Sequence, residues 1–308
     1  MQRKIKYLVL AAFCSWYFSS AFCFRVLGQG TEFTNLHSFV YADGAGPVAS
    51  LLLSGGMLYG TTHTGGESAS GPGAGSVFKL NLDGSGYTTL RVFSGGHDGG
   101  DLAGNLVFAG NKLYGSALFG GASDYGTVFG LSTDGVQLTN LFNFLPAAAS
   151  IPYTNSTGAY PEGGLVISGG VLYGMANVGG TAGWGTLFAV TTNGGSFTNL
   201  HSFSDNDGQT PSASLLLSGG TLYGMTPDGG ANGFGTIFKI ATNGTGFTNL
   251  YNFTYNGGLP YTNSDGANPF GSLILSGNTL YGMASSGGSN ASGTIFKINT
   301  DGLGFTTL

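Results

Sequence analysis

This sequence contains few charged residues, few arginines, and cysteines only near its N-terminus. Asp, Glu, Lys and Arg together make up 7% of its 308 residues, against roughly a quarter in an ordinary soluble domain. Both cysteines, Cys14 and Cys23, lie within residues 1–23, which excludes disulfide and thiol chemistry in the remainder. No stretch keeps a 3.6-residue apolar period, so we expect essentially no helix beyond the N-terminal segment.

Residues 1–23 have the pattern of a secretory signal peptide. A basic start at residues 3–6 precedes a mostly apolar run at 7–18 and small residues at 19–21. A first strand or a retained membrane anchor is the alternative. Cys23 would suit a lipoprotein, but a bulky residue precedes it where a small one is expected. We therefore predict a secreted or cell-surface protein with no transmembrane span in the mature chain.

Removing this segment leaves six basic and fourteen acidic residues, a net charge of −8. Such a surface argues against nucleic acid and anionic lipid as partners. A hydrophobic fraction of 41% argues against disorder.

A tandem repeat dominates the rest of the chain. Leu-Tyr-Gly occurs five times at a spacing of 50 to 59 residues, each time followed by Gly-Gly and then by Gly-Thr/Ser-x-Phe. One supersecondary unit is therefore used five times within residues 24–308. The repeats start near residues 33, 87, 138, 197 and 247, with the start of a truncated sixth at 305.

The fourth copy shows how a repeat divides into strands. Short apolar or alternating runs at 214–217, 221–225, 235–240 and 247–253 are separated by Gly-rich turns. In the last run, apolar residues recur about every three positions rather than every two, which the alternation of a simple pleated strand does not explain. Four antiparallel strands in about 50 residues are typical of a propeller blade.

The fold class is therefore predicted as all-β, a β-propeller of about five four-stranded blades. We expect the first strand to be innermost and most buried, and the repeated Tyr and Phe to pack between blades. Residues 33–39 form a fourth-strand segment that we expect to pair with residues 293–299 and close a five-blade ring. Residues 305–308 are then a surplus tail or the start of a further repeat.

These motifs resemble a known family. Phe-Thr-Asn-Leu-His-Ser-Phe at 33–39 and 197–203, Asp-Gly-x-x-Pro, Leu-Tyr-Gly, Gly-Gly and Gly-Thr-x-Phe are similar to the Gloeo/Verruco (GloVer) tandem repeat over residues 33–308. The resemblance implies an exported, surface-associated bacterial repeat protein, from a family with various C-terminal anchors and no established activity. It supplies no catalytic residues.

Aspartates in the links between blades are candidate metal ligands. Turn chemistry alone explains Asp-Gly followed by Pro, and a loose Ca²⁺ site is the alternative. A calcium loop of the helix-loop-helix type is excluded, because Leu216 occupies the twelfth position counted from Asp205. No other cofactor is indicated. The candidates are Asp43, Asp98, Asp205, Asp207 and Asp265.

Two longer links resemble each other and supply candidate ligand-binding residues. Each contains Pro-Tyr-Thr-Asn-Ser, which places an aromatic ring and an amide on the face where propellers commonly bind ligands. A self-packed surface loop is the alternative. The candidates are Tyr153, Asn155, Tyr261 and Asn263.

No catalytic residue stands out. His37 and His201 share a repeat position with Phe142, so this is a packing position. Arg25 and Arg91 are the only arginines after residue 23, too few for the arginine triad of a sialidase. We expect a binding or adhesion scaffold for an extracellular glycan or surface protein. The alternative is a polysaccharide hydrolase or lyase whose acid and base come from different blades.

Overall fold

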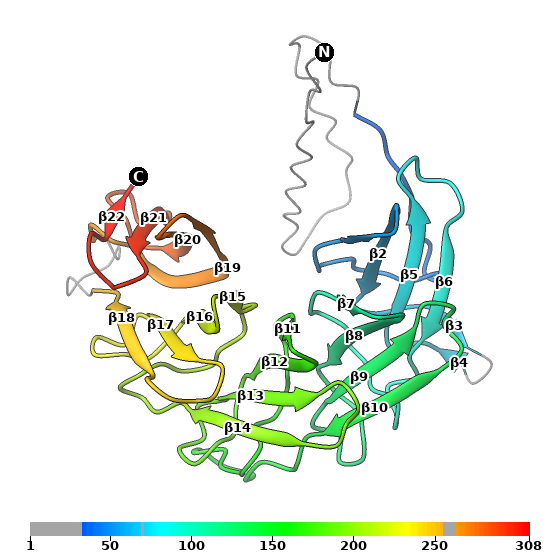
Figure 1. Cartoon of the computed structure of the whole chain (residues 1–308), viewed down its shortest axis with the longest axis horizontal. Helices are drawn as coiled ribbons and strands as arrows, with labels where there is room; N and C mark the ends of the chain where they lie inside the picture. Colours follow the sequence, from blue (N-terminus) through cyan, green and yellow to red (C-terminus); the bar gives the residue numbers. More distant parts are fainter. Residues whose placement is uncertain (1–32, 69–70, 255–262) are drawn as a thin grey trace.

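The computed structural model describes residues 33–68, 71–254 and 263–308, and this part of the chain contains strands but no helix. The signal-peptide prediction and Tyr261 lie outside the described residues. The strands form five four-stranded antiparallel sheets, one for each repeat, which confirms the all-β prediction and the blade number. Figure 1 shows the five blades following one another along an arc.

The blades share one strand plan. In chain order, blade 1 holds β1 (Leu52–Ser54), β2 (Met57–Thr62), β5 (Ser76–Asn81) and β6 (Thr88–Val92), with a small insertion of β3 (Glu67–Ser68) and β4 (Gly71–Pro72). Blade 2 holds β7 (Val107–Ala109), β8 (Lys112–Ala117), β9 (Thr127–Ser132) and β10 (Leu138–Asn143). Blade 3 holds β11 (Val166–Ser168), β12 (Val171–Ala176), β13 (Thr186–Thr191) and β14 (Phe197–Ser202).

Blades 4 and 5 repeat the plan with small changes. Blade 4 holds β15 (Leu216–Ser218), β16 (Thr221–Thr226), β17 (Thr236–Ala241) and β18 (Thr248–Asn252). Blade 5 holds β19 (Ala267–Ser276), β20 (Thr279–Ser286), β21 (Thr294–Asn299) and β22 (Thr306–Thr307). In every blade the strands pair in chain order from first to last.

The two middle strands are the most buried, so the prediction that the first strand is most buried was wrong. In blade 4, β16 and β17 are buried along most of their length, whereas all three residues of β15 are only partly buried. β15 is three residues long and lies on the inner side of the arc (Figure 1). The middle strands of blade 4 are covered on both faces by blades 3 and 5, which explains their near-continuous burial.

Side chains from adjacent blades form the core, as predicted for the repeated Tyr and Phe. Between blades 3 and 4, Tyr173 and Met175 pack with Leu222 and Phe238 in one buried cluster. The ring of Phe238 also explains the Gly of Leu-Tyr-Gly, because a Cβ atom at Gly224 would lie 2.4 Å from the Phe238 Cζ atom. The Phe and the Gly of each repeat therefore depend on each other.

A β-bulge explains the three-residue spacing in the fourth strand. Along the β17–β18 pair, Ile237 faces Tyr251 while the next residue, Phe238, faces Asn249. Leu250 is thus the extra residue of the bulge. Because of this shift, Leu250 and Phe253 both reach the same buried cluster with blade 5.

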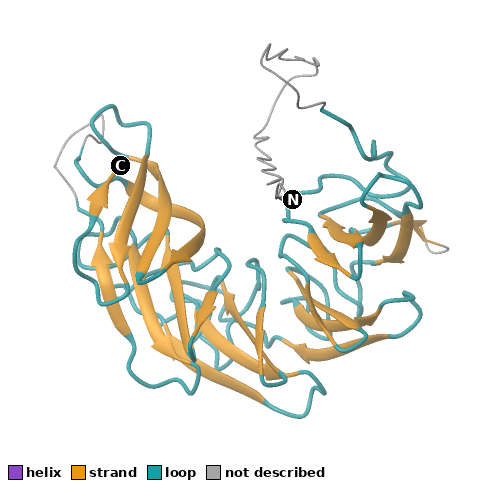
Figure 2. Ribbon diagram, turned by 45° about the horizontal axis from the view of Figure 1, so that its top comes forward, coloured by secondary structure: helices purple, strands orange, loops and turns teal. Residues whose placement is uncertain are grey.

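The blades do not close into a ring, so the predicted pairing of residues 33–39 with residues 293–299 was wrong. Figures 1 and 2 show an open arc with blades 1 and 5 apart. β22 pairs with β21 at Phe296 and Lys297, and therefore occupies the position of the fourth strand. Residues 33–39 lie on blade 1 instead, where Leu36 and Phe39 pack against the buried cluster of Leu58, Phe78 and Leu80.

We expect Phe238→Ala to lower the free energy of unfolding by about 3–5 kcal/mol, as for other large-to-small core changes. The ring is fully buried between two blades, and its removal leaves a cavity. Urea unfolding followed by circular dichroism measures the change. Val136→Ala, at a position with 74% exposure, is the control and should change the stability by less than about 0.5 kcal/mol. A loss below about 1 kcal/mol for Phe238→Ala would contradict this packing.

Candidate binding face

The repeated aspartates of the links bind the side chain of the preceding fourth strand. The Asp207 carboxylate lies 3.0 Å from His201 Nε2 and accepts a hydrogen bond from the Ser204 N–H. Asp43 makes the same 3.0 Å contact with His37. Each histidine ring in turn stacks on an aromatic ring of the next blade, at 3.7 Å between centroids. The histidines are therefore packing residues, as predicted.

In the other links, a different residue of the fourth strand stands opposite the aspartate position. Asp98 lies 3.6 Å from Arg91 and accepts hydrogen bonds from Ser94. Asp265 accepts a 2.8 Å hydrogen bond from the Tyr251 hydroxyl. In the link of blade 3, Thr157 replaces the aspartate and Phe142 replaces the polar strand residue. The aspartate is thus present wherever the strand residue carries a polar group for it to bind.

The five predicted metal ligands are not brought together. Asp205 contacts the Gln209 amide, and the other four carboxylates have the separate partners just described. Across the described residues, no three His, Cys, Asp or Glu side chains form a group that could hold a metal ion. The link aspartates act as turn and strand contacts here, and calcium binding stays a prediction.

The two candidate loop amides hold their own loops. Asn155 Nδ2 donates to the carbonyl oxygens of Leu145 and Gly158, while its Oδ1 accepts from the N–H of Gly180. Asn263 makes the corresponding contacts in the other long link. Tyr153 has an exposed side chain (37%). Of the described candidates, Tyr153 therefore has the side chain that is most available to a ligand.

A set of left-handed residues, which the sequence analysis missed, lies in the same links. Four non-glycine residues of these links have φ between 51° and 64°, and Gly46 has φ 65° at the corresponding place in the first link. Each stands three residues after the aspartate position, where the Asp-Gly-x-x-Pro pattern leaves the residue type free. We call them the left-handed link residues: Asp101, Tyr160, Thr210 and Asn268.

A backbone hydrogen bond between blades holds this conformation. The Tyr160 N–H donates to the Tyr125 carbonyl at 3.0 Å, and the Thr210 N–H donates to the Trp184 carbonyl at 3.0 Å. Asp101 and Asn268 make the same bond to the blade before them. For Tyr160 and Thr210 this region costs on the order of 1–2 kcal/mol, and Asp101 and Asn268 enter it at a smaller cost. Gly46 shows that glycine fits the position, so these four side chains are retained at a cost in strain.

The left-handed link residues meet the loops that follow the second strands. Isolated bridges join link and loop at Gly100 with Phe119, Ala159 with Val178, and Gln209 with Asp228. The links and these loops therefore lie on one face of the molecule. We call this surface the link face.

Side chains of the link face form mixed aromatic and acidic clusters. Tyr160 packs against Phe119 and Tyr125 with ring centroids 5.5 and 5.4 Å apart. Thr210 Oγ1 donates to Asp228 at 3.0 Å, and the Asn268 amide donates to the same carboxylate at 3.1 Å. A face that carries both aromatic rings and carboxylate, hydroxyl and amide groups is suited to binding polar ligands with apolar faces.

A second acidic cluster surrounds Asp101. Its carboxylate lies 2.5 Å from His63 Nε2. Burial raises the pKa of Asp101, the His63 charge lowers it, and the negative charge of Glu162 raises it. Glu162 accepts a 3.0 Å hydrogen bond from the Asn177 amide. Two carboxylates from neighbouring links thus influence each other electrostatically.

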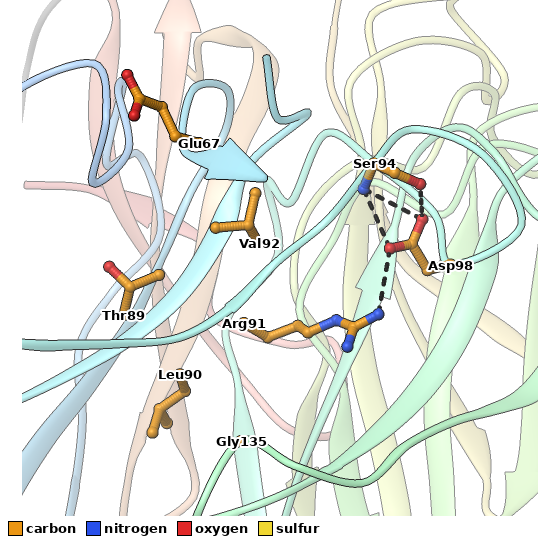
Figure 3. A pocket seen from close by; sticks show the side chains of 8 residues that line it. All are labelled: Glu67, Thr89, Leu90, Arg91, Val92, Ser94, Asp98 and Gly135. Carbon is orange, nitrogen blue, oxygen red and sulfur yellow. Dashed lines mark hydrogen bonds and ion pairs between the residues drawn. The ribbon is translucent and has the colours of Figure 1, made fainter. Parts of the chain in front are cut away.

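A groove of about 590 Å³ lies away from these clusters, beside the outer strand of blade 1. Figure 3 shows the Arg91 guanidinium directed at Asp98, with Glu67 on another wall of the groove. Other blades fill this place with stacked rings, such as Phe142 on Phe197 at 3.8 Å. Here Arg91 and Leu138 replace the two rings. The groove therefore marks a departure from the repeat.

A family model identifies the repeat. The model described as "Gloeobacter/Verrucomicrobia repeat" matches residues 17–155 and 149–308. The chain belongs to this repeat family. No curated protein sequence matches it at a significant level. The resemblance found in the sequence is thereby confirmed over most of the chain.

Solved structures share the fold at low identity. The GH74 enzyme of Niastella koreensis is 17% identical with a TM-score of 0.52, covering 87% of this chain and 38% of the enzyme. A nidogen/laminin complex chain is 14% identical with a TM-score of 0.47, covering 82% of this chain and 75% of that one. TolB from Acinetobacter baumannii is 13% identical with a TM-score of 0.48, covering 80% and 50%. The likeness to the GH74 enzyme agrees with the five antiparallel four-stranded sheets, and this Gloeobacter/Verrucomicrobia repeat protein has a propeller-type arrangement of blades.

No membrane-spanning helix is found in residues 33–68, 71–254 and 263–308.

We expect Tyr251→Phe to flatten the alkaline fall in stability. Burial raises the pKa of the Tyr251 hydroxyl above its ordinary value, and its bond to the Asp265 carboxylate raises it further. A hydroxyl whose pKa is higher in the folded state favours folding below about pH 10 and loses this contribution as the pH rises through the folded value.

Melting temperatures between pH 7 and 12 test this expectation. At neutral pH the variant should be less stable by roughly 1 kcal/mol, because it lacks one hydrogen bond. Above about pH 10 the two curves should converge, because the Tyr251 hydroxyl ionises in the unfolded wild type and its contribution to stability is progressively lost. Other tyrosines titrate in both proteins and cancel in the comparison. Curves that stay parallel would rule out a special role for this hydroxyl.

Proposed function

We propose that this protein is an exported propeller scaffold that binds an extracellular glycan on the link face. The observation that carries the proposal is the set of left-handed link residues. A position that accepts glycine instead holds Asp101, Tyr160, Thr210 and Asn268, in four different residue types and at a cost in backbone strain. Packing alone would favour one residue type repeated in every link, as it does for Phe in the third strand.

The chemistry of the face supports a carbohydrate ligand. Tyr160 and Phe119 supply apolar ring surface, and Phe119 is exposed (43%). Asp228, Thr210 and Asn268 supply hydrogen-bonding groups within one network. Sugars present hydroxyl groups around an apolar ring face, so they match both kinds of group. Export is supported by the basic start and apolar run of residues 1–23, and by the family resemblance.

The second candidate is a polysaccharide hydrolase. Asp101 and Glu162 favour it, because they come from neighbouring links and the charge of one raises the pKa of the other. A raised pKa on one of two carboxylates is the usual arrangement for a general acid. The likeness to a GH74 enzyme concerns the fold and supplies no catalytic residue to this chain.

A glycan array and an activity screen on the same polysaccharides separate the two candidates. Retention of a polysaccharide without release of product is expected. Product release that is abolished by Asp101→Asn would replace the scaffold proposal with the hydrolase.

The ligand site itself is tested by Tyr160→Gly and Phe119→Ala. We expect Tyr160→Gly to weaken glycan binding at least tenfold, which is about 1.4 kcal/mol, while the melting temperature stays within a few degrees. Glycine relieves the left-handed backbone strain and so offsets the lost ring contacts. Phe119→Ala should weaken binding similarly.

Val136→Ala is the matched control, because its exposed side chain lies in a turn outside the link face. Tyr153→Ala reports on the long link and should weaken binding if that loop reaches the same ligand. Unchanged affinity in Tyr160→Gly and Phe119→Ala, with the fold intact, would place binding elsewhere.

A further inference from the structure

Aromatic side chains recur at one position of three consecutive blades on the link face. Tyr125, Trp184 and Phe234 each stand directly before the Gly-Thr pair at the start of the third strand. Each ring is half-buried and packs against the cluster between its own blade and the next one. The three interfaces from blade 2 to blade 5 therefore each carry one partly accessible ring.

Each of these rings has a left-handed link residue beside it. The carbonyl oxygen of each aromatic residue accepts a hydrogen bond from the N–H of the left-handed residue in the next link, at 3.0 Å in all three cases. A ring with an adjacent hydrogen-bonding group is a unit that can hold one sugar. We call each pair a link unit: Tyr125 with Tyr160, Trp184 with Thr210, and Phe234 with Asn268.

One carboxylate joins two consecutive link units. Asp228 lies in the loop after β16, and its Oδ2 accepts a hydrogen bond from the Thr210 hydroxyl at 3.0 Å. Its Oδ1 accepts a hydrogen bond from the Asn268 amide at 3.1 Å. Thr210 precedes blade 4 and Asn268 precedes blade 5. A ligand that contacts Asp228 therefore lies beside both units at once.

The loop after β12 joins the other two neighbouring units. It holds Asn177, whose N–H donates to the Tyr160 carbonyl at 3.1 Å, and Trp184, whose carbonyl accepts the Thr210 N–H. The three link units are thus connected, and Figure 1 shows the blades that carry them following one another along the arc. Phe119, 43% exposed, extends the row toward blade 2 by packing on Tyr160.

The charge of this row excludes an acidic ligand. Asp101, Glu162 and Asp228 are carboxylates of the link face, and even a protonated His63 beside Asp101 leaves the group negative. A polymer with acidic groups would be repelled, whereas hydroxyl groups can donate to these carboxylates. The lysines and arginines of the described residues all stand on strands, rather than in the links: Lys79, Arg91, Lys112, Lys239 and Lys297.

We propose that the link face is one continuous row of subsites for an extended, linear polysaccharide without acidic groups, which rests on the glycan binding proposed above and deepens it. Successive sugars lie along the row from blade 2 to blade 5. Each half-buried ring offers little area, so a single sugar binds weakly. A chain held at one link unit reaches the next unit at high effective concentration, and the contributions of the units combine.

A row of subsites also explains the change of residue type along it. Each link unit meets a different stretch of the same chain, so the polar group at each unit is fitted to a different edge of a sugar. A small ligand would occupy one unit and would leave the differences among Tyr160, Thr210 and Asn268 without a role.

Calorimetry with oligosaccharides of graded length tests the row. The full-length protein is titrated with cello-, manno- and laminari-oligosaccharides of about two to about six sugars. In the series that binds, affinity should rise at least about tenfold from the shortest to the longest member. Oligogalacturonate of the same lengths is the acidic control and should bind at least about tenfold more weakly.

Tyr160→Gly and Thr210→Gly place one change in each of two link units. Glycine adopts the left-handed backbone without strain, as Gly46 does in the first link. Each variant should remove most of the gain in affinity with length, whereas the shortest oligosaccharide should lose affinity in one variant at most. Thr245→Gly is the matched control, because Thr245 is exposed in the turn between β17 and β18, at the opposite end of the strands.

The results separate this row from glycan binding as such. Equal affinity for short and long oligosaccharides would overturn the row and leave a single glycan site. A loss for the longest oligosaccharide in only one of the two variants would do the same, and equal binding of oligogalacturonate would overturn the assignment of charge. Absence of binding to every oligosaccharide and to the parent polysaccharides would overturn both the row and the glycan-binding function.

Discussion

The contact between the phenylalanine of one blade's third strand and the phenylalanine that ends the preceding fourth strand is the interaction on which this structure depends. The ring centroids lie 4.9 to 5.4 Å apart at all five places where it occurs. Each such ring buries enough surface to contribute a few kcal/mol. The Gly of Leu-Tyr-Gly leaves room for the ring, and the bulge in the fourth strand aligns the residue that meets it. Most features of the repeat are consequences of this one contact.

Because the same contact joins every pair of neighbours, the stability of the arc is spread along its length. Each blade contacts only its neighbours, so the structure behaves more like a linear array than like a domain with one central core. The stability of the packed blades therefore does not depend on the polar contacts of the links. The exchange of a His–Asp pair for Phe142 and Thr157 in blade 3 illustrates this freedom, since ring stacking is kept while the hydrogen bond is lost.

The fold could be predicted because its causes are local and repeated. Gly-rich turns, alternating strands and five similar copies gave the blades and their order, and the strands of the fourth copy lie within about two residues of their predicted positions. Ring closure failed because it depends on the angle between blades, which no local pattern encodes. The burial of the first strand was also misjudged, because a run of leucines indicates apolar surroundings without telling which strand lies between two layers.

The candidate site was harder to predict. Repetition drew attention to the aspartates, and their role proved to be contact with the strand before them. Asn155 and Asn263 were chosen as recognition residues, and the backbone of their own loops uses their amides. The left-handed link residues were missed because they are the variable part of an otherwise regular motif. The available signal is that the residue type at this position differs from link to link. The left-handed backbone itself depends on a bond to the preceding blade, which the sequence does not show.

The hydrogen bond made by the left-handed link residues has an evolutionary consequence. It uses the backbone N–H, so it forms with Asp, Tyr, Thr or Asn at the position alike. The backbone bond between the blades therefore does not depend on which side chain stands at this position. A repeat duplicated within the gene would therefore bring with it a link position that accepts several residue types. A family built in this way can vary the side chains of this position by single substitutions while its architecture stays constant.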